Sequence, residues 1–369
     1  MNQSTQFLGI DLHKREAVIA VLPAGAGTCE SVSKLPNEEA PIRRYLKRVA
    51  RRGPIKACYE ASGCGYVLQR RMRAWGHACD VIAPSLAPTR PGDRVKTDRR
   101  DAERLAIDLR AGLLTPVLIP TEAEERVRGL LRSRGNLLQD VHRSKQFLLK
   151  FLDRKDLKRT GKNWTGPFWR WLRGLSFEAE DRYVFESHLG LLEIKQTLLE
   201  EADREIERIS QTAPYREAVG KLRCFRGVDT LTAMTLMGEL IDVRRFSGPR
   251  ALMDYVGLAI SEYSSGPRHR RGGITKAGNN HVRRILVEAA WHYRHHPALG
   301  VGLKKRQAGQ DPTVISHAWR AQHRLYRRFH RLSNRMIKQK AVTAVARELV
   351  GFLWAVLQDD PRYMRSHAG

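Results

Sequence analysis

The chain has 369 residues, enough for two or three domains, and 42% of them are hydrophobic, so a folded protein with sizeable cores is expected. Lysine and arginine outnumber aspartate and glutamate by 66 to 39, and the net charge of +27 favours a polyanion such as nucleic acid as the partner. The five cysteines include no Cys-x-x-Cys pair, and no apolar run reaches the length of a membrane span, which argues against a disulfide framework, a zinc knuckle and a membrane protein. The polar N-terminal residues do not resemble a signal peptide, so we expect a cytoplasmic protein.

The first segment, to about residue 125, has the mixed pattern of an α/β domain. Short apolar runs predict strands, and longer amphipathic stretches predict helices. In chain order the predicted elements are two strands joined in a hairpin (7–12 and 17–22), a helix near 38–52, a strand over 55–59, a helix over 66–76, a strand over 77–83, a loop over 84–95 and a helix over 98–112. Thr97 is placed to cap the free amides at the start of the last helix.

Four carboxylates stand at the ends of these elements. Asp11 closes the first strand and Glu60 ends a later one, while Asp98 and Asp101 are three residues apart at a helix start and share one face. Such a set suits magnesium or manganese, and two ions about 4 Å apart would activate an attacking oxygen and stabilise a leaving one. Each carboxylate alone is more simply a turn, cap or surface residue. The combination, in a basic chain, predicts a metal site that acts on nucleic acid.

The segment from about 126 to 215 is predicted to be helical. Leu192, Leu199 and Ile206 recur every seven residues, which indicates either a short coiled coil or an amphipathic helix packed on its own domain. Upstream, three tryptophans cluster with basic residues over 161–174. They suit stacking on bases or packing between helices, and we favour packing.

The third segment, from about 216 to 350, begins with a predicted pair of helices over 222–240 joined by a tight Gly-Val turn. This pattern resembles a helix-hairpin-helix, a unit that offers backbone amides to a phosphate. The carboxylate of Asp229 at the turn would repel a phosphate, so a purely structural hairpin is at least as well supported.

A serine followed by glycine stands in the next motif, YVGLAISEYSSGPRHRRGGITKAGNNHVRR over 255–284. We expect Ser265 to lie on an exposed, mobile loop, because Gly266, Pro267 and two further glycines surround it. Basic residues that would suit a phosphate with developing negative charge follow: Arg268, Arg270, Arg271 and Lys276. Without further information, a serine before a glycine is an ordinary turn residue, and Ser264 competes for any chemical role.

The last predicted helical region is strongly basic. Between His317 and Lys340 there are eight lysines or arginines and no acidic residue, while an apolar stripe runs along one side through Leu325, Phe329, Leu332 and Met336. One face can therefore pack while the other meets phosphate. The residues predicted to contact nucleic acid are Arg320, Arg324, Arg327, Arg328 and Arg331.

Four motifs, in this order, resemble one known family over nearly the whole chain: FLGIDLHK, YEASG, KTDRRDA and the serine-glycine motif. The family is the DEDD transposases of bacterial insertion sequences, whose relatives include the pilin-gene inverting recombinase. The resemblance implies an α/β ribonuclease H-like N-terminal domain similar to the RuvC Holliday-junction resolvase. It also implies that Asp11, Glu60, Asp98 and Asp101 bind Mg²⁺ or Mn²⁺, and that Ser265 is the nucleophile that attaches to DNA through a phosphoserine bond.

The same resemblance implies the partners and the domain organisation. The partners are the DNA of the element ends and target, a structured guide RNA encoded by the element, and further copies of the chain in a dimer or tetramer, all in the bacterial cytoplasm near the nucleoid. The expected domains are a RuvC-like metal-binding domain (1–125), a helical or coiled-coil linker for oligomerisation (126–215), a mainly α transposase domain with the serine and the helix-hairpin-helix-like unit (216–350) and a tail (351–369).

Three alternatives remain open at the level of sequence. A structure-selective junction endonuclease would use the four carboxylates with water as the nucleophile and would not need Ser265. A sugar kinase also begins with a Gly-Ile-Asp strand, but the residues after Asp11 are His13, Lys14 and Arg15 rather than the glycine and threonine of a phosphate loop. A non-enzymatic nucleic-acid scaffold would need none of the carboxylates.

Overall fold

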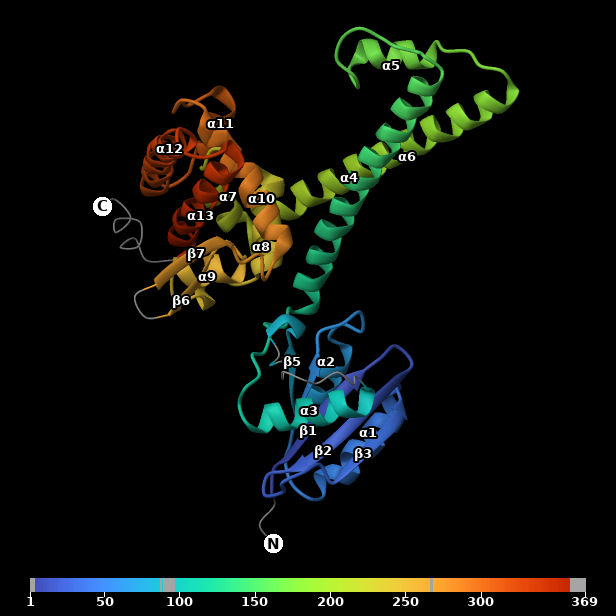
Figure 1. Ribbon diagram of the computed structural model, residues 1–369, viewed down its shortest axis with the longest axis vertical. Helices are drawn as coiled ribbons and strands as arrows, with labels where there is room; N and C mark the ends of the chain where they lie inside the picture. Colours follow the sequence, from blue (N-terminus) through green and yellow to red (C-terminus); the bar gives the residue numbers. More distant parts are fainter. Residues whose placement is uncertain (1–3, 87, 89–96, 266–267, 359–369) are drawn as a thin grey trace. The chain divides into compact units, whose positions relative to one another are not determined.

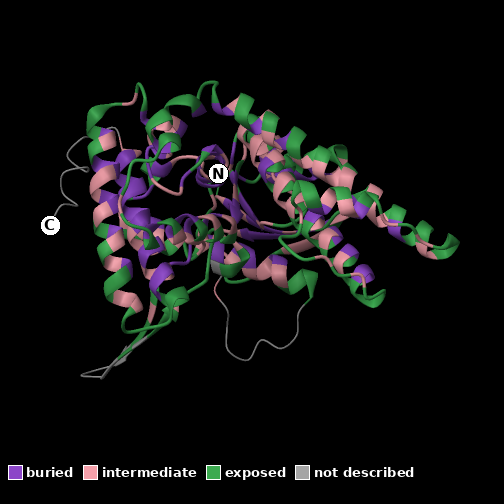
Figure 2. Cartoon of the chain, turned by 90° about the horizontal axis from the view of Figure 1, so that it is seen from above, coloured by how far each residue is buried: buried purple, intermediate pink, exposed green. Residues whose placement is uncertain are grey.

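The computed structural model describes residues 4–86, 88, 97–265 and 268–358, and the chain divides into two compact units between Ile119 and Pro120. The first unit is α/β, and the second is mainly helical (Figure 1). Buried residues, purple in Figure 2, make up most of the central strands of the first unit's sheet, whereas most helices carry a buried stripe beside exposed residues. This is the burial expected of a sheet covered on both faces by amphipathic helices.

The first unit is built on a five-stranded sheet in the order β3-β2-β1-β4-β5. Strands β1, β2 and β3 form an antiparallel meander, and β4 and β5 continue the sheet parallel to β1. Its elements are β1 (Gln6–Leu12), β2 (Glu16–Pro23), β3 (Ser31–Pro36), α1 (Glu39–Ala50), β4 (Ile55–Glu60), α2 (Val67–Ala74), β5 (Ala78–Ile82), a 3₁₀ turn (Pro84–Leu86) and α3 (Asp98–Arg110).

Alternation along the strands divides the unit into three layers. In β1 and β2 one set of alternate residues, including Ile10 and Ile19, packs with α1 and α2, while the opposite set, including Val18 and Ala20, packs against α3. A strand buried on both faces reads as a continuous apolar run, which is why the runs over 7–12 and 17–22 were recognisable in the sequence.

Most of the predicted elements of this unit are confirmed, including the hairpin of β1 and β2 and the cap of α3, where the Thr97 hydroxyl accepts a hydrogen bond from the Arg100 amide. Strand β3 was not predicted. It is a half-exposed edge strand with the sequence SVSKLP, so it lacks the apolar alternation that identifies a strand. Most of the predicted loop over 84–95 lies outside the described residues.

The second unit begins with two long helices, α4 (Glu122–Arg154) and α6 (Ala179–Ser210), connected through the short helix α5 (Gly166–Arg173). They lie side by side and antiparallel (Figure 1). Two contacts show the direction: Arg134 of α4 forms an ion pair with Asp203 of α6, and Ser144, ten residues later in α4, accepts a hydrogen bond from Lys195, eight residues earlier in α6. A capping box of Thr121 and Glu124 begins α4.

The seven-residue stripe of α6 packs within the chain's own helical unit. Leu192 is fully buried in a cluster with α4 and α5, and Ile206 is fully buried in the main core of the unit. The tryptophans Trp164, Trp169 and Trp171 are partly buried and pack against the first of these clusters, which confirms the predicted packing between helices.

The remaining elements of the second unit end with the helix Lys338–Val356, which packs against several of the others and in which every residue from Leu349 to Val356 is buried. They are α7 (Tyr215–Arg223), α8 (Thr230–Leu240), a 3₁₀ turn (Val243–Arg245), α9 (Pro249–Tyr255), β6 (Ile260–Ser265), β7 (Arg268–Ile274), α10 (Asn280–Ala290), a 3₁₀ turn (Trp291–Arg294), α11 (Val301–Gln307), α12 (Pro312–Ser333) and α13 (Lys338–Val356). None of the described helices combines the length and the apolar character needed to cross a bilayer.

The turn between α7 and α8 is packed against the protein itself. Gly227 has φ +80°, and a Cβ on it would lie 2.5 Å from the carbonyl oxygen of Ala289, so this side of the turn is covered by α10. The carboxylate of Asp229 accepts a hydrogen bond from the Thr232 amide and caps α8. Both contacts favour the structural interpretation of this helical pair.

The basic region after His317 is two helices and not one. Helix α12 ends at Ser333, and α13 begins at Lys338, so the predicted stripe continues through Leu325 and Phe329 and stops short of Met336, which is 38% exposed. Serine and asparagine at 333–334 favour caps over helix interiors, which gives the break a physical reason.

Candidate functional site

The predicted carboxylates gather at one edge of the sheet of the first unit. Strands β1 and β4 are parallel neighbours, so Asp11 near the end of β1 and Glu60 at the end of β4 lie at the same edge. Helix α3 starts there with Asp98 and Asp101 in its first turn. The helix approaches β1 closely because Gly9 has no side chain: a Cβ on Gly9 would lie 2.0 Å from the Ala102 carbonyl oxygen.

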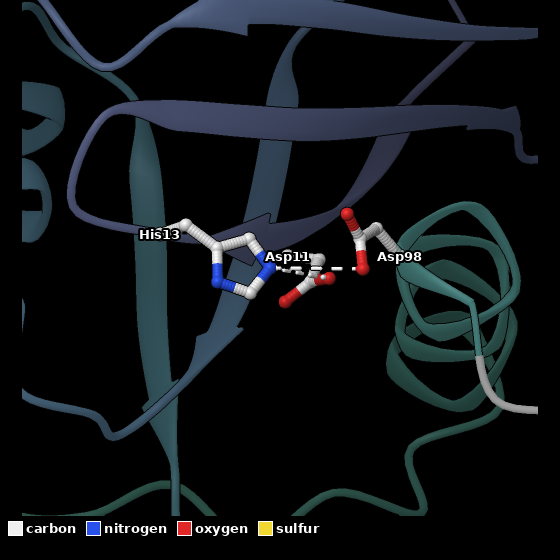
Figure 3. Close-up of side chains that lie close together, drawn as sticks. All are labelled: Asp11, His13 and Asp98. Atoms are coloured by element: carbon white, nitrogen blue, oxygen red, sulfur yellow. Dashed lines mark hydrogen bonds and ion pairs between the residues drawn. The ribbon is translucent and has the colours of Figure 1, made fainter.

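Asp11 and Asp98 meet around the imidazole of His13 (Figure 3). The Nε2 atom of His13 is 3.2 Å from Oδ2 of Asp11 and 3.8 Å from Oδ1 of Asp98. One oxygen or nitrogen atom from each of the three side chains lies within 4.8 Å of the others. The two aspartates come from segments 87 positions apart, so this meeting is a product of the fold.

Glu60 and Asp101 are linked by a second basic side chain. Nη2 of Arg104, one turn further along α3, lies 3.3 Å from Oδ1 of Asp101 and 3.8 Å from Oε1 of Glu60. The four carboxylates therefore stand as two pairs, one bridged by an imidazole and the other by a guanidinium. Neither His13 nor Arg104 was predicted as a site residue. The sequence signal that could have identified them is their spacing from the carboxylates: His13 is two residues after Asp11, and Arg104 is three residues after Asp101 on the same helix.

The electrostatics of this edge fit a divalent cation. Burial raises the pKa of the Asp11 carboxyl above its ordinary value, and the negative charges of Asp98 and Asp101 act in the same direction, whereas the nearby His13 opposes them. Crowded carboxylates repel one another, and a bound cation relieves that repulsion. Carboxylate oxygens are the ligands that Mg²⁺ and Mn²⁺ prefer, so the donor set fits such an ion.

The predicted nucleophile belongs to the second unit. Ser265 is the last residue of β6 and pairs in register with Arg268 of β7, so the expected loop is wrong and this segment is an antiparallel hairpin. The glycine-rich composition suggested a loop, whereas the hairpin places Gly272 and Gly273 within a strand. Gly266 and Pro267 lie outside the described residues, as do the side chains of Ser264, Ser265, Arg268 and Arg271. Arg270 and Lys276 are exposed.

All five arginines predicted on α12 line one cleft of about 750 Å³ between α12 and α13. Four of them, Arg320, Arg324, Arg327 and Arg331, recur every three or four residues, and Arg328 adjoins Arg327, so all five lie on one side of the helix. Glu348 of α13 forms ion pairs with Arg324 and Arg328 and neutralises only part of this charge. The cleft is lined by Trp319, Arg320, His323, Arg324, Arg327, Arg328, Arg331, Glu348 and Phe352.

Carboxylates converging on a sheet edge, together with an arginine-lined cleft in a chain of net charge +27, are the features expected of an enzyme that acts on nucleic acid with a divalent metal. Comparison with known proteins makes the class specific. Residues 8–155 match the family model of DEDD transposases of the IS110 type, and residues 220–300 match the transposase IS116/IS110/IS902 family.

Individual relatives agree over almost the full length. A protein of Sinorhizobium fredii that is named as a transposase (y4qE) is 40% identical over 357 residues, which cover 96% of this chain and 88% of that relative. The transposase of the insertion sequence element IS1533 from Leptospira borgpetersenii is 33% identical, covering 88% of this chain and 96% of its own. The chain belongs to the IS110/IS116 family of insertion-sequence transposases. It is therefore a DNA-binding enzyme of transposition, and membership in a DEDD family indicates that it uses a divalent metal.

Proposed function

We propose that this transposase cuts and rejoins DNA with a metal site formed by Asp11, Glu60, Asp98 and Asp101 and with Ser265 as the nucleophile. The observation that carries the proposal is the gathering of carboxylates from β1, β4 and α3 at one sheet edge. The strand order β3-β2-β1-β4-β5, with β2 antiparallel to its neighbours, supports a ribonuclease H-like fold similar to RuvC for this domain.

In the proposed reaction, Oγ of Ser265 attacks a backbone phosphorus of DNA and loses its proton. The bond from that phosphorus to a deoxyribose oxygen breaks, and the released oxygen takes up a proton. Attack on the phosphoserine by a hydroxyl of another strand end restores a phosphodiester and frees the serine, so rejoining needs no ATP. Magnesium or manganese at the carboxylates would supply charge neutralisation and lower the pKa of the attacking or leaving hydroxyl.

The basic residues have separate proposed roles. Arg268, Arg270, Arg271 and Lys276 on and after β7 would hold the phosphate next to Ser265. The five arginines of the α12 cleft would hold a nucleic-acid backbone elsewhere on the second unit, because counterion release from phosphates makes such a surface bind polyanions strongly.

We further propose that an RNA encoded by the element selects the DNA sites and that the protein acts as a dimer or tetramer, with the α4–α6 segment in oligomer contacts. Base pairing would read the sequence while the protein holds backbones, which accounts for a large charge without a base-reading motif. The working compartment would be the bacterial cytoplasm at the nucleoid.

A covalent adduct assay tests the chemistry. Purified protein is incubated with Mg²⁺, element-end DNA and the flanking noncoding RNA, and protein-linked DNA is measured on a denaturing gel. We expect an adduct with wild type and with the adjacent control Ser264→Ala, and none with Ser265→Ala or Asp11→Ala. Cleavage that persists in Ser265→Ala without an adduct would replace the serine mechanism by a RuvC-like endonuclease using water. Omitting the RNA shows whether it is required.

A further inference from the structure

We infer that His13 is a ligand of the metal site, so that the site offers nitrogen as well as oxygen and binds Mn²⁺ in preference to Mg²⁺. This inference rests on the proposed metal site and concerns a residue outside the four carboxylates. It makes His13 a specificity-determining residue, since Mg²⁺ takes almost only oxygen ligands whereas Mn²⁺, a transition metal, also accepts an imidazole nitrogen.

The geometry of three donor atoms supports this role. Nε2 of His13 and one oxygen each of Asp11 and Asp98 lie within 4.8 Å of one another. Donors bound to one first-row metal at about 2.0–2.2 Å are separated by no more than about 4.4 Å, so small side-chain adjustments suffice for all three to share an ion. Figure 3 shows the imidazole directed at the space where the two carboxylates meet.

The backbone of His13 is held in place from both sides. Its amide donates a hydrogen bond of 2.9 Å to the Glu16 carbonyl oxygen across the β1–β2 turn, and its carbonyl oxygen accepts one of 2.8 Å from Nδ2 of Asn37. The side chain is 50% exposed, so a metal ion can reach it from solvent. The fixed backbone leaves only the two side-chain torsions to be ordered on coordination, and the 3.2 Å contact of Nε2 with Asp11 already directs the ring to the site.

The charge balance at the site favours the same assignment. Arg104 stands between Glu60 and Asp101, but a guanidinium cannot ligate a metal. His13 is the basic residue between Asp11 and Asp98, and a neutral imidazole can exchange its contact with a carboxylate for a bond to the ion. The Asp11, His13 and Asp98 side chains would then hold one ion from three directions.

Pulsed electron paramagnetic resonance of bound Mn²⁺ in the full-length protein tests this directly. We expect ¹⁴N modulation from a coordinated imidazole in wild type and its loss in His13→Ala, with the signal kept in His77→Ala, a control at the start of β5 and so at the opposite sheet edge. Calorimetric titration should show Mn²⁺ affinity falling about tenfold in His13→Ala while Mg²⁺ affinity changes little.

The outcomes separate this inference from the proposed function. If wild type binds Mn²⁺ without nitrogen modulation, and Asp98→Asn weakens that binding, the carboxylate site stands and the role of His13 is overturned. Equal losses of Mn²⁺ and Mg²⁺ affinity in His13→Ala would also overturn it, since they would indicate a merely structural contact. If neither ion binds to wild type, or Asp98→Asn leaves binding unchanged, the proposed metal site itself fails.

Discussion

Removing the guanidinium of Arg132 should destabilise the second unit by about 3 kcal/mol. The carboxylate of Glu239 on α8 is 1% exposed and accepts two hydrogen bonds from Arg132 of α4, at 2.7 and 2.9 Å, and one of 2.8 Å from Asn279 at the start of α10. Substitution Arg132→Ala leaves this buried charge with the amide alone, and breaking a buried pair in this way costs about 3–5 kcal/mol. Arg132 is itself 46% exposed, so water partly replaces it and the lower figure applies.

Urea unfolding followed by tryptophan fluorescence measures this effect, because Trp75 is the one tryptophan of the first unit and the other six belong to the second. With a slope of about 2–3 kcal/mol per molar urea, the midpoint should fall by about 1 M. The matched control is Arg132→Ala combined with Glu239→Gln, which removes the buried charge and should recover about 1–2 kcal/mol. A shift below about 0.5 kcal/mol, or a double variant no more stable than the single one, would refute the reasoning.

The same pair predicts a pH dependence. Burial alone would raise the pKa of Glu239, but the hydrogen bonds from Arg132 and Asn279 outweigh it and hold the pKa below the ordinary value of 4.5. A depressed pKa in the folded state stabilises the protein above pH 4.5, and that stabilisation is lost as pH falls through the folded-state pKa. In Arg132→Ala burial is no longer opposed by the guanidinium. The stability difference between wild type and variant should therefore shrink when unfolding is repeated at pH 4.

Three further predictions concern the first unit. Gly9→Ala places a Cβ 2.0 Å from the Ala102 carbonyl oxygen, so α3 must move; we expect a loss of at least about 1–3 kcal/mol by thermal unfolding, and no change in Gly25→Ala, where the new Cβ meets nothing within 4 Å. Arg104→Gln removes a cation beside two proposed ligands and should tighten Mn²⁺ binding by about tenfold in calorimetry; weaker binding would contradict a competing role for the guanidinium. Thr97→Ala deletes the cap of α3 and should lower the free energy of unfolding by about 1 kcal/mol, whereas Thr97→Ser keeps the capping hydroxyl and should retain most of that stability. Equal losses in both variants would argue against capping.

Local chemistry made much of the first unit predictable. The strands β1 and β2 are recognisable because most of their residues are buried and form nearly continuous apolar runs, and β4 and β5 each keep a short buried apolar stretch, at 57–59 and 81–82. The start of α3 follows from Thr97, whose side chain can satisfy a free amide within one turn. Asp11 and Glu60 were also identifiable from the local sequence, because each is an acidic residue at the end of a predicted strand.

The features that depend on distant partners could not be predicted in this way. Strand β3 exists because it pairs with β2, and the hairpin of β6 and β7 exists because two polar, glycine-containing segments satisfy each other's backbone groups. Likewise, the stripe through Leu192 and Ile206 specified a helix with one buried face, but the stripe alone left open whether another copy or the chain itself covers that face. Tertiary packing places these residues against the chain's own helices.

The candidate site also has some features that the local sequence determines and others that only the tertiary structure determines. The sequence of the chain determined which carboxylates and arginines are available and that they begin or end helices and strands, because those signals act over a few residues. Tertiary structure decided that Asp11 and Asp98 share an imidazole and that Arg104 stands between Glu60 and Asp101. The physical reason is the close packing of α3 on β1 at Gly9, a contact between segments about ninety positions apart that no local pattern encodes.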